Sequence, residues 1–324
     1  MSPVHRSSTD REDNGLQYVI MDVFTREKFK GNPLAVVFED TEGNPLSGVE
    51  KQTIAKEFNL SETVFVGKRE ADDTNDKFWP LTIMTPMEEL PFAGHPVVGA
   101  ACALSVGGGL VAKGSFETKA GPIRFSVGPS AESSSHSTAC AEISVPFDVH
   151  LHKTVANLTD IGQQGLSTSR NDFPFFSITK GMTYILVEVS SFAALNQVSL
   201  SRKKLDVELD KDWSPSFVGT YFFYRAPHSG TGEPIELHTR MIEPDLGEDP
   251  VTGSTASALT AYLTLEAAKE VSSQRKFEYR VTQGEYMGRK GTPTVIVALD
   301  ESKAISSMTL KGDAVRVMTG AIER

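Results

Sequence analysis

Residues 92–104 read FAGHPVVGAACAL and predict a buried helix that starts beside a glycine. His95 can act as the N-cap, and Pro96 suits the first helical position because its missing N–H would have no partner there. Small and apolar side chains occupy nearly every position after Pro96. The helix therefore lacks a polar face and is expected to be buried on every side. The three glycines at 107–109 then end it.

The second half of the chain repeats this combination. Residues 249–254 read DPVTGS, and a second helix rich in small residues is predicted at 255–269. Gly94 and Gly253 are separated by about half of the chain. The repetition predicts an α+β fold of two pseudo-symmetric domains, each a mixed or antiparallel sheet rolled around a central buried helix. Strands and helices do not alternate strictly, which argues against a doubly wound sheet.

Segments rich in β-branched and aromatic residues surround both helices and predict the strands of the two sheets. In the first half they lie at 17–24, 34–38, 62–66, 78–85, 115–118 and 123–127, with a further helix at 49–58. In the second half they lie at 142–145, 175–179, 184–189, 218–225, 235–241, 277–282 and 294–299. Residues 163–172 are expected to form a loop, and the low-complexity stretch 128–139 marks the boundary between the halves.

Composition and charge exclude several classes of protein. Apolar residues make up 39% of the chain, which is enough for a real core. The 42 acidic residues outnumber the 32 basic ones, and this net charge of −10 argues against a nucleic-acid partner, which needs a basic surface. No apolar run is long enough to cross a bilayer, and residues 1–15 are polar, unlike a signal peptide. We therefore expect a cytoplasmic protein with no membrane partner and a disordered tail at 1–15.

Residues that commonly bind metals are sparse. Cys102 and Cys140 are the two cysteines, and neither has the spacing of a zinc site. Cys102 lies among alanines and is expected to pack in the core. His150 and His152 have the spacing of neighbours on one face of a strand, but no obvious third ligand accompanies them. The sequence therefore predicts no metal site.

The two glycine-led helices indicate a binding site for an anion. A helix N-terminus presents unpaired N–H groups and a partial positive charge, and glycine lets a ligand approach the backbone closely. If the two halves face each other, the N-termini at Gly94 and Gly253 converge in the cleft between them. Two ordinary capped helices are the alternative, and a single loop of this kind would favour that alternative.

Polar residues at the two helix starts supply candidate chemistry. His95 titrates near neutral pH and can move protons, although a lone histidine is more often a cap or a surface residue. Asp249 beside Glu248 suggests repulsion between carboxylates, which would raise a pKa if the pair is buried. Thr252 and Ser254 are also good N-cap residues.

Several short motifs occur in a fixed order along the chain, and together they resemble one known family. They are MDVFT at 21–25, GNPLAVV at 31–37, LSETVF at 60–65, TP at 85–86 with ELPFAGHP at 89–96, EDPVTGS at 248–254, and QG at 283–284 followed by GR at 288–289. The ordered set is similar to the PhzF-like (phenazine biosynthesis-like) family, which has the diaminopimelate epimerase-like fold. The match runs from about residue 18 to the C-terminus.

The resemblance implies an arrangement of domains. Residues 16–130 together with about 308–324 would form an N-terminal barrel-like domain, and residues 140–307 a C-terminal one. The active site would lie in the cleft between them. The inserts at 130–138 and 163–172 depart from compact family members and are expected to reshape the mouth of the cleft. A homodimer is the implied assembly.

The resemblance also implies proton transfer without a cofactor. Glu62 heads an apolar strand, where a glutamate is usually solvated, yet it falls on the family's catalytic acid/base. His95 and Asp249 are the other implied catalytic residues, and they stand where diaminopimelate epimerase has a cysteine at each helix start. The implied substrate-binding residues are Asn32, Gly94, Thr252, Gly253 and Ser254.

We therefore expect an isomerase or epimerase that moves a proton on a small carboxylate-bearing substrate, with no cofactor and no metal. A lyase is the enzymatic alternative, because the same carbanion can expel a β-leaving group instead of being reprotonated. A non-catalytic ligand-binding relative of the fold is the other alternative. The joint presence of Glu62, His95, Asp249 and Ser254 speaks against it.

Overall fold

The computed structural model describes residues 15–39, 45–71, 77–106, 111–130, 137–201, 203, 205, 207–227, 233–244, 247–270 and 274–323. The first half forms β1 (Leu16–Val23), β2 (Asn32–Glu39), α1 (Gly48–Phe58), β3 (Thr63–Gly67), β4 (Glu70–Ala71), β5 (Lys77–Met84), β6 (Glu89–Leu90), α2 (Gly94–Ser105), β7 (Lys113–Thr118), β8 (Gly121–Pro129) and β9 (Thr138–Ser144). The second half forms β10 (His150–Ala156), β11 (Phe173–Thr179), β12 (Met182–Glu188), α3 (Phe192–Asn196), β13 (Phe217–Arg225), β14 (Ile235–Glu243), β15 (Gly247–Asp249), α4 (Gly253–Glu270), β16 (Lys276–Gln283), β17 (Thr294–Leu299) and β18 (Ile305–Ile322).

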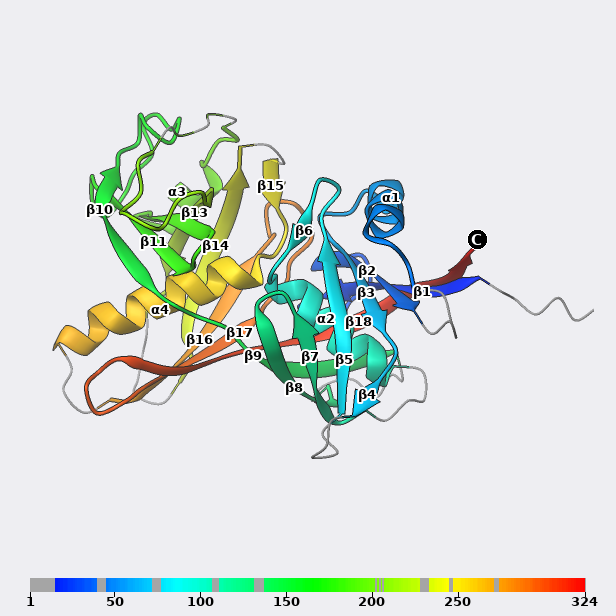
Figure 1. Cartoon of the computed structure of the whole chain (residues 1–324). Coiled ribbons are helices and arrows are strands. Elements are labelled where there is room, and N and C mark those ends of the chain that lie inside the picture. The colour runs from blue at the N-terminus through cyan, green and yellow to red at the C-terminus, as the bar shows by residue number, and fades with distance from the viewer. Residues whose placement is uncertain are drawn as a thin grey trace, which may run out of the picture.

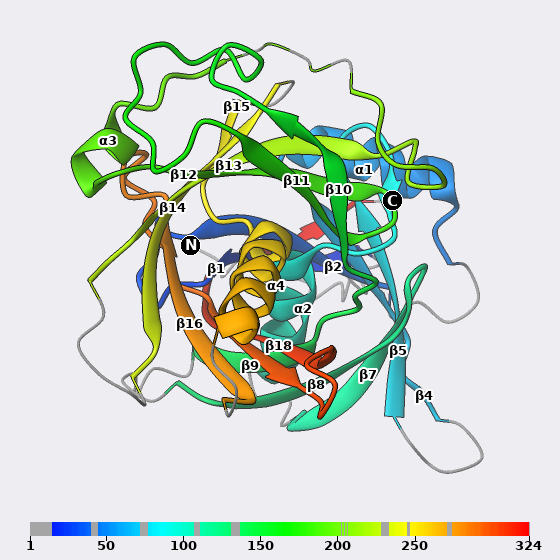
Figure 2. The same cartoon turned by 90° about the vertical axis from the view of Figure 1, so that its left-hand side faces the viewer.

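Strands enclose the two small-residue helices, α2 and α4. Residues 94–103 of α2 and 253–264 of α4 are all buried. α2 contacts β1, β2, β8, β9 and β18, while α4 contacts β11, β12, β16, β17 and β18. Figure 2 shows both helices inside a ring of strands. Small side chains along the helices allow the strands to approach closely on several sides. The C-terminal end of α4 reaches the surface: residues 265–267 are partly exposed, and Lys269 and Glu270 are exposed.

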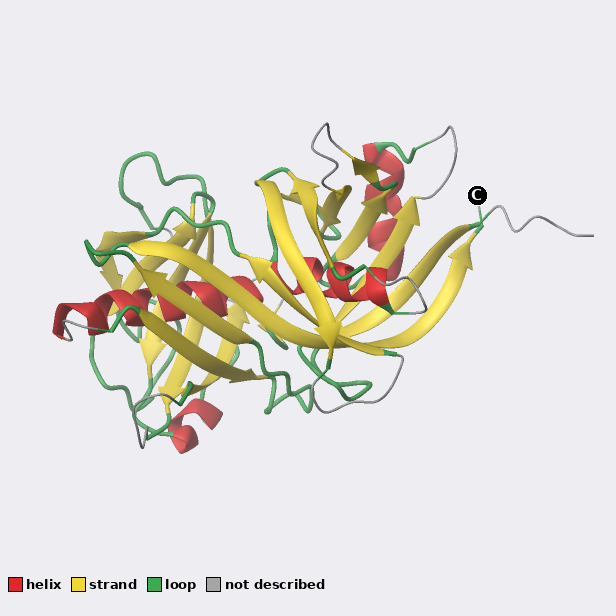
Figure 3. Cartoon of the chain, turned by 90° about the horizontal axis from the view of Figure 1, so that it is seen from below, coloured by secondary structure: helices red, strands yellow, loops and turns green. Residues whose placement is uncertain are grey.

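β18 is one long strand that serves both halves of the molecule (Figure 1, red). Its residues 305–311 pair with β17, and its residues 314–322 pair with β1. The C-terminal residues therefore return to the N-terminal strands, as the family resemblance implies. Figure 3 shows helices among strands in both halves of the molecule, joined by long strands that run from one half into the other.

The position of β9 differs from the prediction that the C-terminal domain starts at residue 140. It pairs with β8 and β18 and packs on α2. Ala139 and Ala141 are buried on its inner face, and the backbone oxygen of Ala139 accepts a hydrogen bond from the Cys102 thiol at 3.4 Å. β9 therefore belongs with the strands around α2, and the chain crosses to the other half after Ser144. The other domain boundaries and the pseudo-symmetry stay predictions.

The remaining predicted elements match the observed ones to within two residues at each end, apart from the start of β9. The sequence does not predict α3, β4, β6, β10 and β15, most of which are very short, and of the long strand β18 only about 314–318 is expected to be strand. Residues 163–172 contain no helix or strand, as expected. Outside the described residues lie 1–14 of the predicted tail at 1–15, the glycines at 107–109 and most of the insert at 130–138. Among the residues described, no helix combines the length and apolar character that a membrane crossing requires.

Candidate active site

The N-termini of α2 and α4 meet at the centre of the molecule. A Cβ atom at Gly94 would lie 2.9 Å from the backbone carbonyl carbon of Gly253, and one at Gly253 would lie 3.2 Å from the Cα atom of Gly94. The glycines allow this approach because each lacks a Cβ atom that would push the two backbones apart. The two sets of helix N–H groups therefore converge, as the paired motifs predict.

Glu62 lies in the turn between α1 and β3 and reaches the start of α2. The turn follows Asn59, whose left-handed backbone (φ 50°) ends α1. The Glu62 side chain is 15% exposed, and its Oε2 lies 3.4 Å from His95 Nε2. Burial, and after it the negative charge of Asp249, raises the pKa of Glu62 to about 8, while a hydrogen bond with Ser61 opposes the shift. At neutral pH the carboxyl group therefore holds a proton most of the time.

This pKa predicts a pH-dependent difference in stability between the natural chain and Glu62→Gln. Below about pH 4.5 Glu62 is protonated in both folded and unfolded chains, so its ionisation has no effect. Between pH 4.5 and about 8 only the unfolded chain releases the proton, so the natural chain loses stability as pH rises, by up to about 5 kcal/mol. The variant cannot ionise at this position. Urea midpoints should therefore move in the variant's favour between pH 5 and pH 8, and parallel curves would contradict the assigned pKa.

His95 does not cap α2, contrary to the sequence prediction. The helix begins at Gly94 with Ala93 as N-cap, because the contact between Gly94 and α4 draws the first turn back toward the centre. Burial lowers the pKa of His95 to about 3, so the ring is neutral. Asn32 Nδ2 lies 3.4 Å from His95 Nδ1. Both N–H groups of that amide are directed elsewhere, so this contact does not decide which ring nitrogen carries the proton. The other ring nitrogen, Nε2, faces Glu62.

Asp249 is held by residues from both halves of the chain. Asn32 Nδ2 donates to Asp249 Oδ1 at 3.0 Å and to the backbone oxygen of Val251 at 2.9 Å. The Thr252 hydroxyl donates to the other carboxyl oxygen, Oδ2. Burial raises the pKa of Asp249, and the hydrogen bonds from Thr252 and Asn32 oppose that shift. With both oxygens engaged, Asp249 is placed to orient Asn32 and the start of α4.

Glu248 contributes little to the predicted repulsion between carboxylates. Its two oxygens accept hydrogen bonds from Arg240 Nε at 2.8 Å and Nη2 at 2.7 Å, and both side chains are buried. Its charge is only the last of the effects that raise the pKa of Asp249, and burial is the first. Neighbouring residues on a strand point to opposite faces, which separates the two carboxyl groups.

Gln283 holds the segment between β15 and α4, although the sequence analysis does not assign it to the site. Its Nε2 donates to the backbone oxygen of Asp249 at 2.8 Å and to Thr252 Oγ1 at 3.1 Å. Its Oε1 accepts from Thr252 N at 3.2 Å and from the Tyr221 hydroxyl at 2.9 Å. Nearby, Ser254 Oγ accepts from a buried tyrosine, Tyr184, at 2.9 Å. The QG motif at 283–284 is the sequence signal that points to Gln283.

Three buried polar atoms beside the helix starts make no hydrogen bond within the described part of the chain, although two of them, on Glu62 and His95, lie 3.4 Å apart. They are Asn32 Oδ1, Glu62 Oε2 and His95 Nε2. An unpaired buried polar atom costs about 1–3 kcal/mol, so packing does not account for three of them in one place. Catalytic sites are one place where such atoms are retained. A carbonyl oxygen, a carboxyl group and an imidazole nitrogen can together bind a polar ligand and move a proton.

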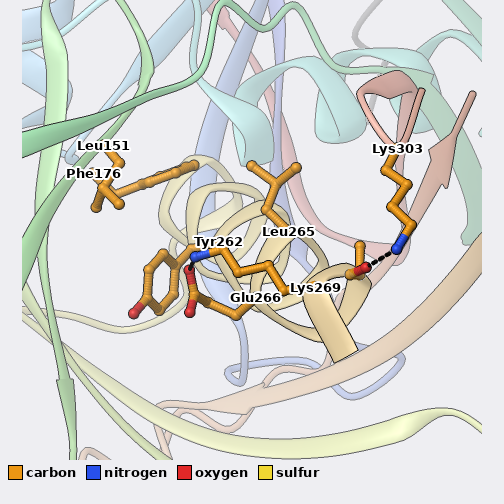
Figure 4. Close-up of a pocket in the computed structure, with 8 residues that line it drawn as sticks. Leu151, Phe176, Tyr262, Leu265, Glu266, Lys269 and Lys303 are labelled. Carbon is orange, nitrogen blue, oxygen red and sulfur yellow. Dashed lines mark hydrogen bonds and ion pairs between the residues drawn. The ribbon is translucent and has the colours of Figure 1, made fainter. Parts of the chain in front are cut away.

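A separate pocket lies near the other end of α4 and is not part of this site (Figure 4). Leu265 in its wall lies about 18 Å along the helix from Gly253. Its charged groups have partners already: Lys269 Nζ pairs with Glu266 at 2.5 Å, and Lys303 Nζ donates to the backbone oxygen of Ala268 at 2.6 Å. The pocket therefore lacks the unpartnered polar groups that mark the helix starts.

Comparison with known proteins places the chain in one family. The model of the phenazine biosynthesis-like family matches residues 21–320. The chain belongs to this family. A relative from Pseudomonas chlororaphis named trans-2,3-dihydro-3-hydroxyanthranilate isomerase is 30% identical over 94% of this chain and 98% of its own length. An uncharacterized isomerase of Mesorhizobium japonicum is also 30% identical, with the same two coverages.

Solved structures show that the phenazine biosynthesis-like family shares this fold. A PhzF family protein of Bacillus anthracis aligns with a TM-score of 0.73 at 22% identity and covers 95% of this chain and 99% of its own. A probable proline racemase from Agrobacterium radiobacter aligns with a TM-score of 0.56 at 13% identity, over 95% and 93% of the two chains. At these identities the likeness shows the fold alone, a barrel-forming sheet with helices. The predicted family resemblance is confirmed.

The structure thus brings together residues that lie far apart in this family member's sequence. Glu62, His95, Asn32 and Asp249 are linked by contacts of 3.0 to 3.4 Å. The other residues predicted to bind substrate, Gly94, Thr252, Gly253 and Ser254, lie at the two helix starts beside them. The individual roles of all eight residues stay predictions.

Proposed function

We propose that this member of the phenazine biosynthesis-like family is an isomerase that moves a proton on a small carboxylate-bearing substrate without a cofactor. The observation that carries the proposal is the set of unpartnered buried atoms on Asn32, Glu62 and His95 beside two converging helix N-termini. The names of the relatives, which are isomerases, support it.

In this proposal the helix starts hold negative charge. The N–H groups at Gly94 and Gly253 bind the substrate carboxylate and the enolate-like charge that develops when a proton leaves carbon. His95 is neutral, and its Nε2 faces the same region. No basic side chain is needed, because the backbone supplies the donors and the helix dipoles supply the field.

Glu62 is the group that moves the proton. It takes a proton from one substrate carbon and returns it to another carbon or to the other face. A pKa of about 8 makes the Glu62 carboxylate a stronger base than a solvated glutamate. The ionised form, which is the minor one at neutral pH, is the form that takes the proton from carbon. Asp249, through its bond to Asn32, keeps the acceptor oxygen of Asn32 aimed at the ligand.

The first compound to test is trans-2,3-dihydro-3-hydroxyanthranilate, because relatives from Pseudomonas carry that name and the compound bears a carboxylate. A panel of small cyclic and amino-acid carboxylates completes the set. The chain is incubated with each compound in heavy water, and the products are read by proton NMR and mass spectrometry.

The three candidate functions, an isomerase, a lyase and a non-catalytic binding protein, predict different results in heavy water. An isomerase gives a product of unchanged composition that carries deuterium at carbon. A lyase gives a product that has lost a β-substituent, and a binding protein gives neither change while still shifting the ligand's NMR signals. Loss of a substituent without deuterated isomer would overturn the proposal.

The organisation of the molecule is part of the same proposal. Two glycine-led helices, each among strands, support two pseudo-symmetric domains with the site between them. The homodimer and the cytoplasmic location implied by the family resemblance remain predictions.

A further inference from the structure

A cluster of metal-binding residue types lies on the outer side of the second half, away from Glu62 and His95. His150 and His152 project from the same face of β10, because alternate residues of a strand do so. The sequence expectation that this pair lacks a third ligand is wrong: Asp210, from the irregular segment between α3 and β13, places Oδ2 2.9 Å from His150 Nε2. One ligand atom from each of the three residues lies within 4.8 Å of the other two.

A chain of hydroxyl groups fixes the orientation and tautomer of His152, whose side chain is buried. His152 Nε2 lies 2.8 Å from Ser177 Oγ, which lies 2.7 Å from Thr183 Oγ1, which lies 2.8 Å from Ser216 Oγ. Ser216 donates to the backbone oxygen of Phe217 at 3.0 Å. When each hydroxyl donates one step toward that oxygen, His152 Nε2 must be the donor, so Nδ1 keeps its lone pair.

The lone pair of His152 Nδ1 faces the cluster. The backbone N–H of Asp210 donates to Nδ1 at 3.3 Å, which is a long hydrogen bond. Metal-binding histidines characteristically donate their other ring N–H to a fixed partner, as His152 does to Ser177.

We propose that His150, His152 and Asp210 bind a divalent transition-metal ion of the Zn²⁺ type. Two imidazole nitrogens and one carboxylate oxygen are ligands that Zn²⁺ prefers, with solvent in a fourth position. Ligand atoms at about 2.0–2.2 Å from a tetrahedral ion lie about 3.4 Å from one another. The more distant ligand atoms must therefore draw together by about 1 Å, while His150 and Asp210 are already close enough. Asp210 lies outside helices and strands and can supply that movement. The side chains of His150 and Asp210 are 32% and 22% exposed, which leaves a path for the ion.

The ion would fasten a long irregular connection to the sheet. Residues 197–216 link α3 to β13 without any helix or strand in their described part. Near the cluster, Thr154 Oγ1 donates to the backbone oxygen of Glu208 at 3.1 Å, and Lys153 N donates to Asp210 Oδ1 at 3.5 Å. A ligand that binds only the folded chain stabilises it. The role proposed for the ion is structural, and it stands apart from the isomerase proposal.

Thermal unfolding of the full chain tests the site. After treatment with a chelator and dialysis, Zn²⁺ at one hundred times its Kd is expected to raise Tm by about 4 °C. Mg²⁺ at the same concentration should have no effect, because it prefers oxygen ligands. Trp213 stacks on His150 with ring centroids 4.7 Å apart, so Cu²⁺ should quench its fluorescence.

Three variants make the test specific. Asp210→Asn preserves size and His150→Gln preserves hydrogen bonding, and each should weaken Zn²⁺ binding by at least about 100-fold, more than the loss of an outer partner costs. His238→Gln is the matched control, because His238 also pairs with a carboxylate, that of Glu285 at 2.8 Å, but no second imidazole completes a site there among the described residues. Its affinity for Zn²⁺ should equal that of the natural chain. An unchanged Tm with Zn²⁺, or unaltered affinity in folded Asp210→Asn, would overturn the proposal.

Discussion

Glu62→Gln is expected to lose proton exchange at the substrate carbon by about 10²–10⁴-fold, the range that general acid–base catalysis supplies. Glutamine keeps the shape and hydrogen-bonding capacity of the side chain but cannot accept a proton as a carboxylate does. The variant should fold normally and bind the substrate carboxylate as the natural chain does, because the helix N–H groups are untouched. Deuterium uptake by the substrate, followed by NMR, measures the exchange.

Two comparisons make this result specific to the site. Glu57→Gln, an exposed position on α1 five residues earlier, should exchange at the natural rate. Asp249→Asn should be milder than Glu62→Gln, because Asp249 is assigned to positioning and relay through Asn32. If the Glu62 variant exchanges protons at close to the natural rate, the catalytic assignment fails, and His95 or Asp249 becomes the next candidate base.

Gly94→Ala should be strongly damaging although alanine is the better helix former. Its Cβ atom would lie 2.9 Å from the carbonyl carbon of Gly253 and 2.8 Å from Leu310 Cδ2. A backbone carbon cannot swing aside as a side chain can, so the two helix starts must separate. Overpacking of this kind costs about 1–3 kcal/mol of stability. Displacement of binding groups by about 1 Å can cost about 100-fold in rate.

A matched substitution separates crowding from helix propensity. Gly48 is also the first residue of a helix, α1, but a Cβ atom there meets nothing within 4 Å. Gly48→Ala should therefore leave the free energy of unfolding unchanged or raise it by about 0.5–1 kcal/mol. Urea unfolding and the heavy-water exchange assay, run on both variants, give the comparison. Equal behaviour of the two alanine variants would show that the helix starts are not packed as described.

The fold was largely predictable because local sequence patterns predict the two buried helices at its centre. The small-residue runs behind Gly94 and Gly253 are buried helices in the structure, as their composition requires. The start of β9 was misplaced because the first two residues of its inner face are alanines, Ala139 and Ala141, beside a low-complexity stretch, which is a weak strand signal. The dual role of β18 follows from pairing with β1 and β17, which no local pattern encodes.

The site was predictable only in part, for the same reason. Charge and spacing indicated the helix starts, but Glu62 has no local feature that marks it, and only the family resemblance singled it out. Its high pKa arises from burial and from Asp249, almost two hundred residues away in the chain. His150 and His152 likewise needed Asp210, which the fold of an irregular segment supplies. Contacts between residues so far apart in the chain leave no periodic pattern in the sequence that would predict them.

The pKa of Glu62 in the free protein tests the central claim most directly. It can be measured by ¹³C NMR titration of the chain labelled at glutamate side-chain carboxyl carbons, with Glu62→Gln identifying the signal. A buried carboxyl group poised to take and return a proton should titrate at about 8. A midpoint near 4.5 would mean that Glu62 is solvated, and would contradict its assignment as the group that moves the proton.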